Sequence, residues 1–151
     1  MRGLRRRTER GSIAPALPVI AMSLLLLGGL TIDASRQLNA RGEATAFAEE
    51  AARAGAQGVD ITADELVLDE TMARDRVDRY CARVERLGQV RDCRFVRFEP
   101  VGDGDGRLLV VVTEVEMSIK ASLLGMVGVR TLTASAVARA RPYEGITEPI
   151  E

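Results

Sequence analysis

The chain has 151 residues, with 21 lysines and arginines against 22 acidic residues, no histidine, no tryptophan and 3% aromatic residues. This charge balance gives a nucleic acid no basic surface to bind, and the missing histidines remove the side chain most often used as a general base. We therefore predict a non-enzymatic protein with no catalytic residue, no cofactor, no metal site and no small-molecule substrate.

An uncharged run, Ile13 to Ile32, lies near the N-terminus. At about 1.5 Å of rise per residue it would extend roughly 30 Å as a helix, which is the thickness of the hydrocarbon core of a bilayer. We predict a transmembrane helix over residues 12–33. A cleaved secretory signal and processing near Gly11 remain as alternatives, and both would also export the rest of the chain.

The first eleven residues form a basic leader that predicts the orientation of the span. Five arginines precede the apolar run against one acid, Glu9, whereas only Arg36 and Arg41 lie close to its other end. Because positively charged residues stay on the cytoplasmic side of a membrane, we expect a single-pass protein of the cell membrane. Residues 1–11 would lie in the cytoplasm and the C-terminal part outside it.

Residues 34–58 predict an Ala-rich stalk helix that continues from the span. Small residues recur in it at steps of three and four, on one helical face: Ala44, Ala48, Ala51, Ala52 and Gly55. Such a face permits the close approach of another element. It covers either the protein's own domain or a helix of another subunit, in which case it is an assembly stripe, and both interpretations stay open.

Residues 59–141 predict a small extracytoplasmic domain that begins with a short connector. Apolar residues at helical spacing then predict a second helix from Glu70 to Leu87, with Asp69 as its cap and Gly88 as its stop.

After this helix the hydrophobic period changes to two. This change predicts three strands, at residues 93–99, 107–119 and 129–141, in a mainly antiparallel sheet. The Gly- and Asp-rich residues 102–106 predict a hairpin turn between the first two strands, and residues 142–151 a flexible tail. The apolar segment 123–127 is expected to form a flap over the sheet, or alternatively to cover a ligand.

Cys81 and Cys93 are the two cysteines of the chain. An even number of cysteines in a segment expected outside the cytoplasm predicts a disulfide. A metal site is disfavoured because two thiolates have neither a histidine nor a second cysteine pair to complete four ligands.

The order of these features resembles the TadE/TadG-like proteins of Flp-type (Tad) pilus assembly. The resemblance is carried by an Arg-rich leader, Gly11-Ser12, a span that opens at once, an Asp just after it and a polar Ala-rich helix. The segment KASLLGMVGVRTLTASAVARAR is similar to the loop and last strand of these proteins. Some members are cut by a prepilin peptidase after a Gly, with Glu as the fifth mature residue; here Gly11 is present but Ala16 holds that place.

The resemblance implies a membrane-anchored, pilin-like minor component of Flp pilus assembly or of the associated secretion machinery. Its partners would be the lipid bilayer and other pilus-assembly or pilin-like membrane proteins, contacted by helix packing. The alternative is an anchored extracytoplasmic ligand-binding or sensor module. The expected fold is α+β, with a long N-terminal helix, a second helix and a small three-stranded sheet.

Overall fold

The computed structural model describes residues 15–60, 67–101 and 109–143. In chain order its elements are α1 (Ala16–Ala56), β1 (Val59–Asp60), β2 (Val67–Leu68), α2 (Glu70–Glu85), β3 (Val90–Pro100), β4 (Leu109–Lys120), the 3-10 helix η1 (Leu124–Val127) and β5 (Thr131–Ala140). The predicted α+β fold is confirmed, because a long apolar N-terminal helix is followed by a second helix and a small antiparallel sheet.

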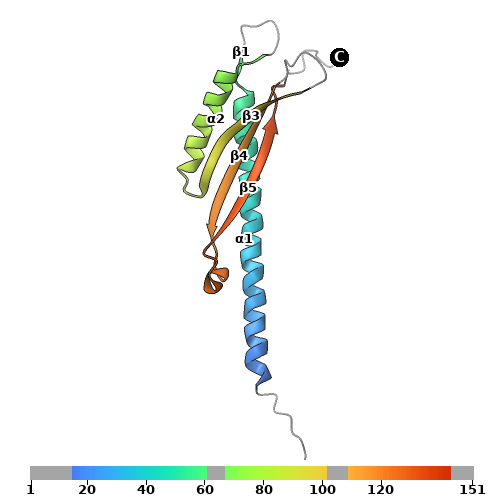
Figure 1. Cartoon of the computed structure of the whole chain (residues 1–151), viewed down its shortest axis with the longest axis vertical. Helices are drawn as coiled ribbons and strands as arrows, with labels where there is room; N and C mark the ends of the chain where they lie inside the picture. Colours follow the sequence, from blue (N-terminus) through green and yellow to red (C-terminus); the bar gives the residue numbers. More distant parts are fainter. Residues whose placement is uncertain (1–14, 61–66, 102–108, 144–151) are drawn as a thin grey trace, which may run out of the picture.

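Helix α1 runs the length of the molecule (Figure 1). Its 41 residues correspond to about 60 Å at 1.5 Å per residue. The N-terminal part projects alone, whereas the C-terminal part packs against the sheet and α2. Pro18 lies in the first turn, where its missing N–H group breaks no helical hydrogen bond. The predicted span and stalk are thus one continuous helix.

The three-stranded sheet has the order β3-β4-β5, and both strand pairs are antiparallel. Central strand β4 turns Val111, Thr113, Val115 and Met117 toward one face, and all four are at most 1% exposed. Their partners on β5 are alanines, as in the pairs Thr113 with Ala138 and Met117 with Ala134. The side chains on the core face of β5 are therefore short, and α1 packs against this part of the sheet.

Small residues on both surfaces let α1 approach the sheet closely. Thr113 is buried, and its hydroxyl donates a hydrogen bond of 2.7 Å to the backbone oxygen of Ala48. Gly55 has no room for a side chain, because a Cβ there would lie 2.7 Å from Val77 Cγ2 and 2.8 Å from Val111 Cγ1. The domain formed by β1 to β5 and α2, called the head below, is therefore built directly onto α1.

Helix α2 begins as predicted and ends slightly earlier. The Asp69 side chain accepts a hydrogen bond of 2.9 Å from the backbone N–H of Met72, as expected of an N-cap. The helix ends at Glu85 rather than Leu87, and Gly88 has a φ of 77° in the turn that follows. Leu87 is 64% exposed and lies beyond the helix.

The strands differ from their predicted bounds by a few residues. The first begins at Val90 instead of residue 93, and the third begins at Thr131 instead of residue 129. The connector contains a short antiparallel pair, in which Val59 pairs with Leu68. The predicted turn at residues 102–106 lies outside the described residues, as does the tail from residue 144.

The prediction of a flap over the sheet was wrong. Helix η1 follows the end of β4 and lies beside α1, at the end of the head nearest the N-terminal part of α1 (Figure 1). The segment lies here because Leu123 packs against Gly29 of α1 and fills the space where a side chain of Gly29 would be. These two residues are far apart in the sequence.

Two glycines of α1 provide a matched test of this packing. Gly55→Leu should lower the free energy of unfolding by about 1–3 kcal/mol, since the core has no free volume there. Gly42→Leu should raise it by about 0.5–1 kcal/mol, because Gly42 faces open space and leucine favours helix. Circular dichroism in detergent would measure both. Equal effects of the two substitutions would contradict the packing described.

Candidate functional site

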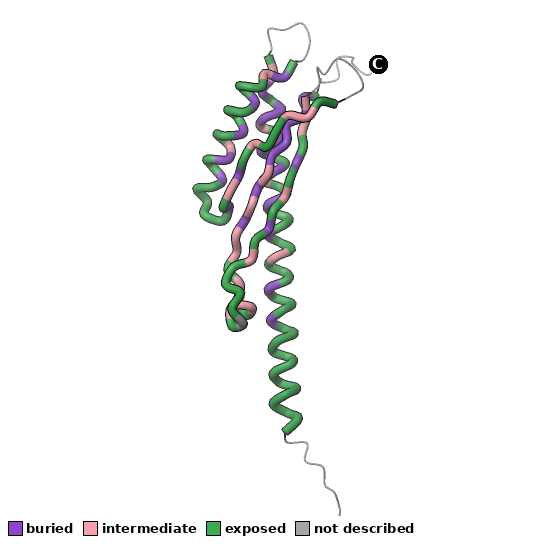
Figure 2. The backbone as a smooth tube through the Cα atoms, viewed as in Figure 1, coloured by how far each residue is buried: buried purple, intermediate pink, exposed green. Residues whose placement is uncertain are grey.

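The N-terminal part of α1 exposes an apolar surface. Figure 2 shows this part almost entirely exposed, in contrast to the part inside the head. Its exposed apolar residues include Leu17, Ile20, Leu24, Leu27 and Leu30, each at least 52% exposed. By length and composition, α1 is a candidate membrane span. Residues 1–14, among them the leader, Gly11, Ser12 and Ile13, lie outside the described residues.

Asp33 joins α1 to the segment that carries η1. Residues 121–130, called the junction loop below, connect β4 to β5. Asp33 Oδ1 accepts a hydrogen bond of 2.8 Å from the backbone N–H of Ser122, and Oδ2 accepts bonds of 2.9 and 2.7 Å from those of Leu123 and Leu124. Asp33 is completely buried, so both carboxylate oxygens are used inside the protein.

Two further side chains of α1 hold the same end of the sheet. The guanidinium of Arg36 donates a hydrogen bond to the hydroxyl of Ser122, and the Gln37 amide donates one of 2.5 Å to the backbone oxygen of Thr133. Together with Asp33 they lie directly after the apolar part of α1. The junction between span and head is therefore a cluster of polar contacts rather than a free linker.

The space between α1 and the junction loop is filled. A Cβ at Gly29 would lie 2.7 Å from Leu123 Cβ, and Gly29 is buried although its neighbours on α1 are exposed. The alternative of a ligand held beneath the segment Leu123–Val127 therefore finds no space at this contact.

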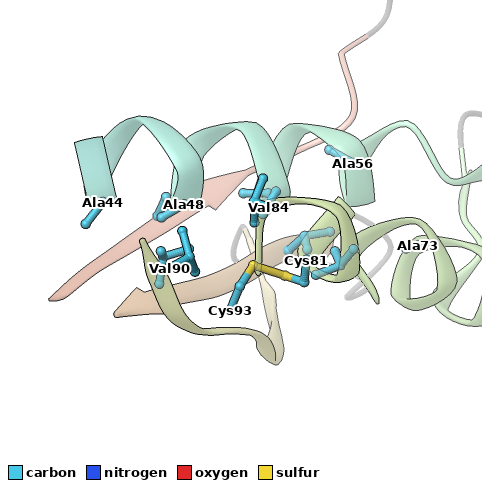
Figure 3. Close-up of a cluster of buried hydrophobic side chains, with 14 of the residues drawn as sticks. Ala44, Ala48, Ala56, Ala73, Cys81, Val84, Val90 and Cys93 are labelled. Atoms are coloured by element: carbon cyan, nitrogen blue, oxygen red, sulfur yellow. A yellow bond between two sulfur atoms is a disulfide. The ribbon is translucent and has the colours of Figure 1, made fainter. Parts of the chain in front are cut away.

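The small-residue stripe faces the protein's own head. Ala44, Ala48, Ala51 and Ala52 are fully buried, and Gly55 is also buried. Figure 3 shows Ala44 and Ala48 turned toward the cluster around Val84, Val90 and the cysteines. Of the two interpretations, the structure therefore corresponds to packing within the chain. In this fold these residues are not accessible to another subunit, and a charge at Ala48 or Ala52 would disrupt the head itself.

Cys81 of α2 and Cys93 of β3 form a disulfide (Figure 3). Their Cα atoms lie 5.1 Å apart, and both residues are at most 7% exposed. The bond fastens α2 to the first strand of the sheet on the side away from β5. The disulfide thus holds the β3 side of the sheet to α2, and α1 packs against the sheet at β4 and β5.

The outer face of the sheet carries a lattice of ion pairs that the sequence did not reveal. Glu99 lies between Arg97 and Arg139, accepting a bond of 2.9 Å from Arg139 Nε, and Arg94 pairs with Glu114 at 2.7 Å. The hydrogen bond from Arg139, aided by Arg97, holds the pKa of Glu99 below its usual value. The alternation of charged with apolar residues along the strands indicated that the charged side chains share one face. Which of them form ion pairs depends on the register between neighbouring strands, which the sequence does not give.

The described residues contain no group of three or more Cys, Asp and Glu side chains that could hold a metal ion. The acidic side chains of the outer face are instead bonded to arginines.

The N-terminal part of the chain is similar to a known protein family. Residues 11–58 match the family described as "Putative Flp pilus-assembly TadE/G-like". The resemblance inferred from the sequence is confirmed for this segment, which covers about a third of the chain. No curated protein and no solved structure matched the chain.

The TadE/G-like segment coincides with a structural unit. It ends two residues after Ala56, the last residue of α1, and so contains the candidate span, Asp33 and the whole small-residue stripe. The match suggests involvement in Flp pilus assembly. The head from β1 onward lies outside the matched segment.

Asp33 and Asp69 give a matched test of the junction. Asp33→Asn replaces one acceptor oxygen by an NH₂ group that faces backbone donors, so the amides of Ser122, Leu123 and Leu124 should exchange hydrogen at least tenfold faster. Asp69→Asn should leave the exchange at Met72 nearly unchanged, since asparagine caps helices as well as aspartate. Hydrogen-exchange mass spectrometry would measure both, and unchanged exchange in Asp33→Asn would contradict the role assigned to Asp33.

The disulfide should contribute strongly to the stability of the head. Replacing both Cys81 and Cys93 by alanine removes the constraint on the unfolded chain and should lower the free energy of unfolding by about 3 kcal/mol. Denaturant unfolding of the oxidised protein and the double variant measures the difference. Maleimide labelling of the intact protein should require reductant, and ready labelling without it would contradict the bond.

Proposed function

We propose that the protein is a membrane-anchored, pilin-like minor component of Flp pilus assembly or of its associated secretion machinery. It acts through helix packing and protein-protein contacts and catalyses no reaction. Residues 1–11 lie in the cytoplasm, α1 crosses the membrane, and the head stands outside the cytoplasm.

The observation that carries this proposal is the continuity of α1. An apolar segment long enough to cross a bilayer passes without interruption into the core of the head, and the family match covers this same unit. A rigid connection of this kind transmits the position and tilt of the span to the head. That property suits a component whose head must be presented in register with neighbouring subunits.

The proposed contacts with partner proteins lie along the span. Among the described residues its apolar side chains are largely exposed, and Gly28 leaves a gap on the helix, since a Cβ there would meet no atom within 4 Å. Small residues in a span allow a second helix to approach closely. The remaining surface of the span would contact lipid.

The orientation is supported by charge and by the cysteines. The arginines of the leader favour a cytoplasmic N-terminus. The disulfide in the head suits an oxidising compartment, because cytosolic thiols are kept reduced.

Deleting the gene in the organism that carries it should abolish or sharply reduce Flp pili on the cell surface, as measured by shearing and electron microscopy. The intact chain should restore them. A chimera in which residues 13–28 are exchanged for the span of an unrelated single-pass protein keeps Gly29 and Asp33. It should insert and form the disulfide but fail to restore pili, because the side chains that contact partner helices are gone.

Each arm of this experiment has a contradicting result. Normal pili in the deleted strain would refute the proposed function. Pili restored by the chimera would refute helix packing by the span while leaving a role in pilus assembly in place.

A further inference from the structure

The junction loop lies at the depth of the last turn of the candidate span. Gly29, which Leu123 contacts, precedes Asp33 by four residues, or about 6 Å along the helix axis. Any bilayer that contains the apolar part of α1 therefore reaches the level of this loop. This step rests on the part of the proposed function in which α1 crosses the membrane.

The loop exposes apolar side chains at this level. Met126 is 82% exposed, Val129 is 42% exposed and Leu123 is 38% exposed. Leu30 and Ile32 of α1 are also at least half exposed. These residues make the apolar surface of the loop continuous with that of the span.

The backbone of the loop is suited to an apolar surrounding. The N–H groups of residues 122–124 donate hydrogen bonds to Asp33. Those of Met126, Gly128 and Val129 donate to backbone oxygens within the loop. Unpaired backbone groups are costly in lipid, and for these six residues that cost is already removed. The three bonds to Asp33 also fix the loop against α1, so little order is lost on contact with the membrane.

Asp33 is buried against the loop, and the exposed charged side chains next to the loop are basic. Lys120 precedes the loop, Arg130 is its last residue, and both are exposed, while Arg36 lies against Ser122. From residue 117 to residue 143 the chain has no acidic residue. Lysine and arginine next to an apolar tip place their charges among lipid phosphates while their stems stay in the apolar layer.

We propose that the junction loop is a second membrane contact, which inserts Met126 and Leu123 into the interfacial layer of the same bilayer that α1 spans. Lys120 and Arg130 bind the anionic headgroups above it. The head is then attached to the membrane at two points, the span and the loop, and its orientation relative to the bilayer is fixed.

Because the chain has no tryptophan, single-tryptophan variants test this contact directly. Met126→Trp probes the loop, and Leu24→Trp probes the middle of the span. Tyr143→Trp is a matched control, since Tyr143 is 78% exposed and lies near Ala56 and Gln57, at the end of α1 away from the loop. Each full-length variant is reconstituted into vesicles of phosphatidylcholine and phosphatidylglycerol. The vesicles contain lipid brominated either near the headgroup or near the chain ends.

Fluorescence of Met126→Trp should be quenched mainly by the shallow bromine, with emission shifted to the blue relative to Tyr143→Trp. Leu24→Trp should be quenched mainly by the deep bromine and Tyr143→Trp by neither. Quenching of Leu24→Trp without quenching of Met126→Trp would overturn the loop contact and leave the anchor in place. Absence of quenching in Leu24→Trp would overturn the anchor itself, and with it the loop contact.

Discussion

The structure depends on one helix that meets two different surroundings. Over its first part α1 directs apolar side chains outward on nearly every side, and over its second part it offers the head a face of alanines and glycine. The small face allows the sheet to lie close to the helix backbone, as the bond from Thr113 to Ala48 shows. The head consequently has no fold separate from α1, because its core is completed by the helix that anchors it.

The change from one surrounding to the other occurs at Asp33. A charged residue directly after an apolar run marks its end in the sequence, but here the carboxylate also binds three backbone N–H groups of the junction loop. A linker at this position would let the head rotate freely about the span. The contacts of Asp33, Arg36 and Gln37 instead hold the head against α1, as the proposed function by helix packing requires.

Local patterns predicted most of the fold. The periods of the apolar residues located α2 and the three strands, and the Asp69 cap was correctly read. Local patterns could not predict which residues far apart in the sequence contact one another. Small residues suit a contact with any helix or sheet, so the pattern at Ala44–Gly55 left the choice of partner open until the sheet was placed. The flap was misplaced for a related reason, since Gly29 and Leu123 are 94 residues apart and no periodicity connects them.

The central claim is that hydrocarbon surrounds the exposed apolar part of α1. Alkaline carbonate extraction of membranes from cells that produce the protein tests it most directly. We predict that the chain stays in the membrane pellet with its N-terminal run intact and is released only by detergent. Recovery of the chain in the soluble fraction, whole or shortened by removal of that run, would contradict the anchor and the pilus role built on it.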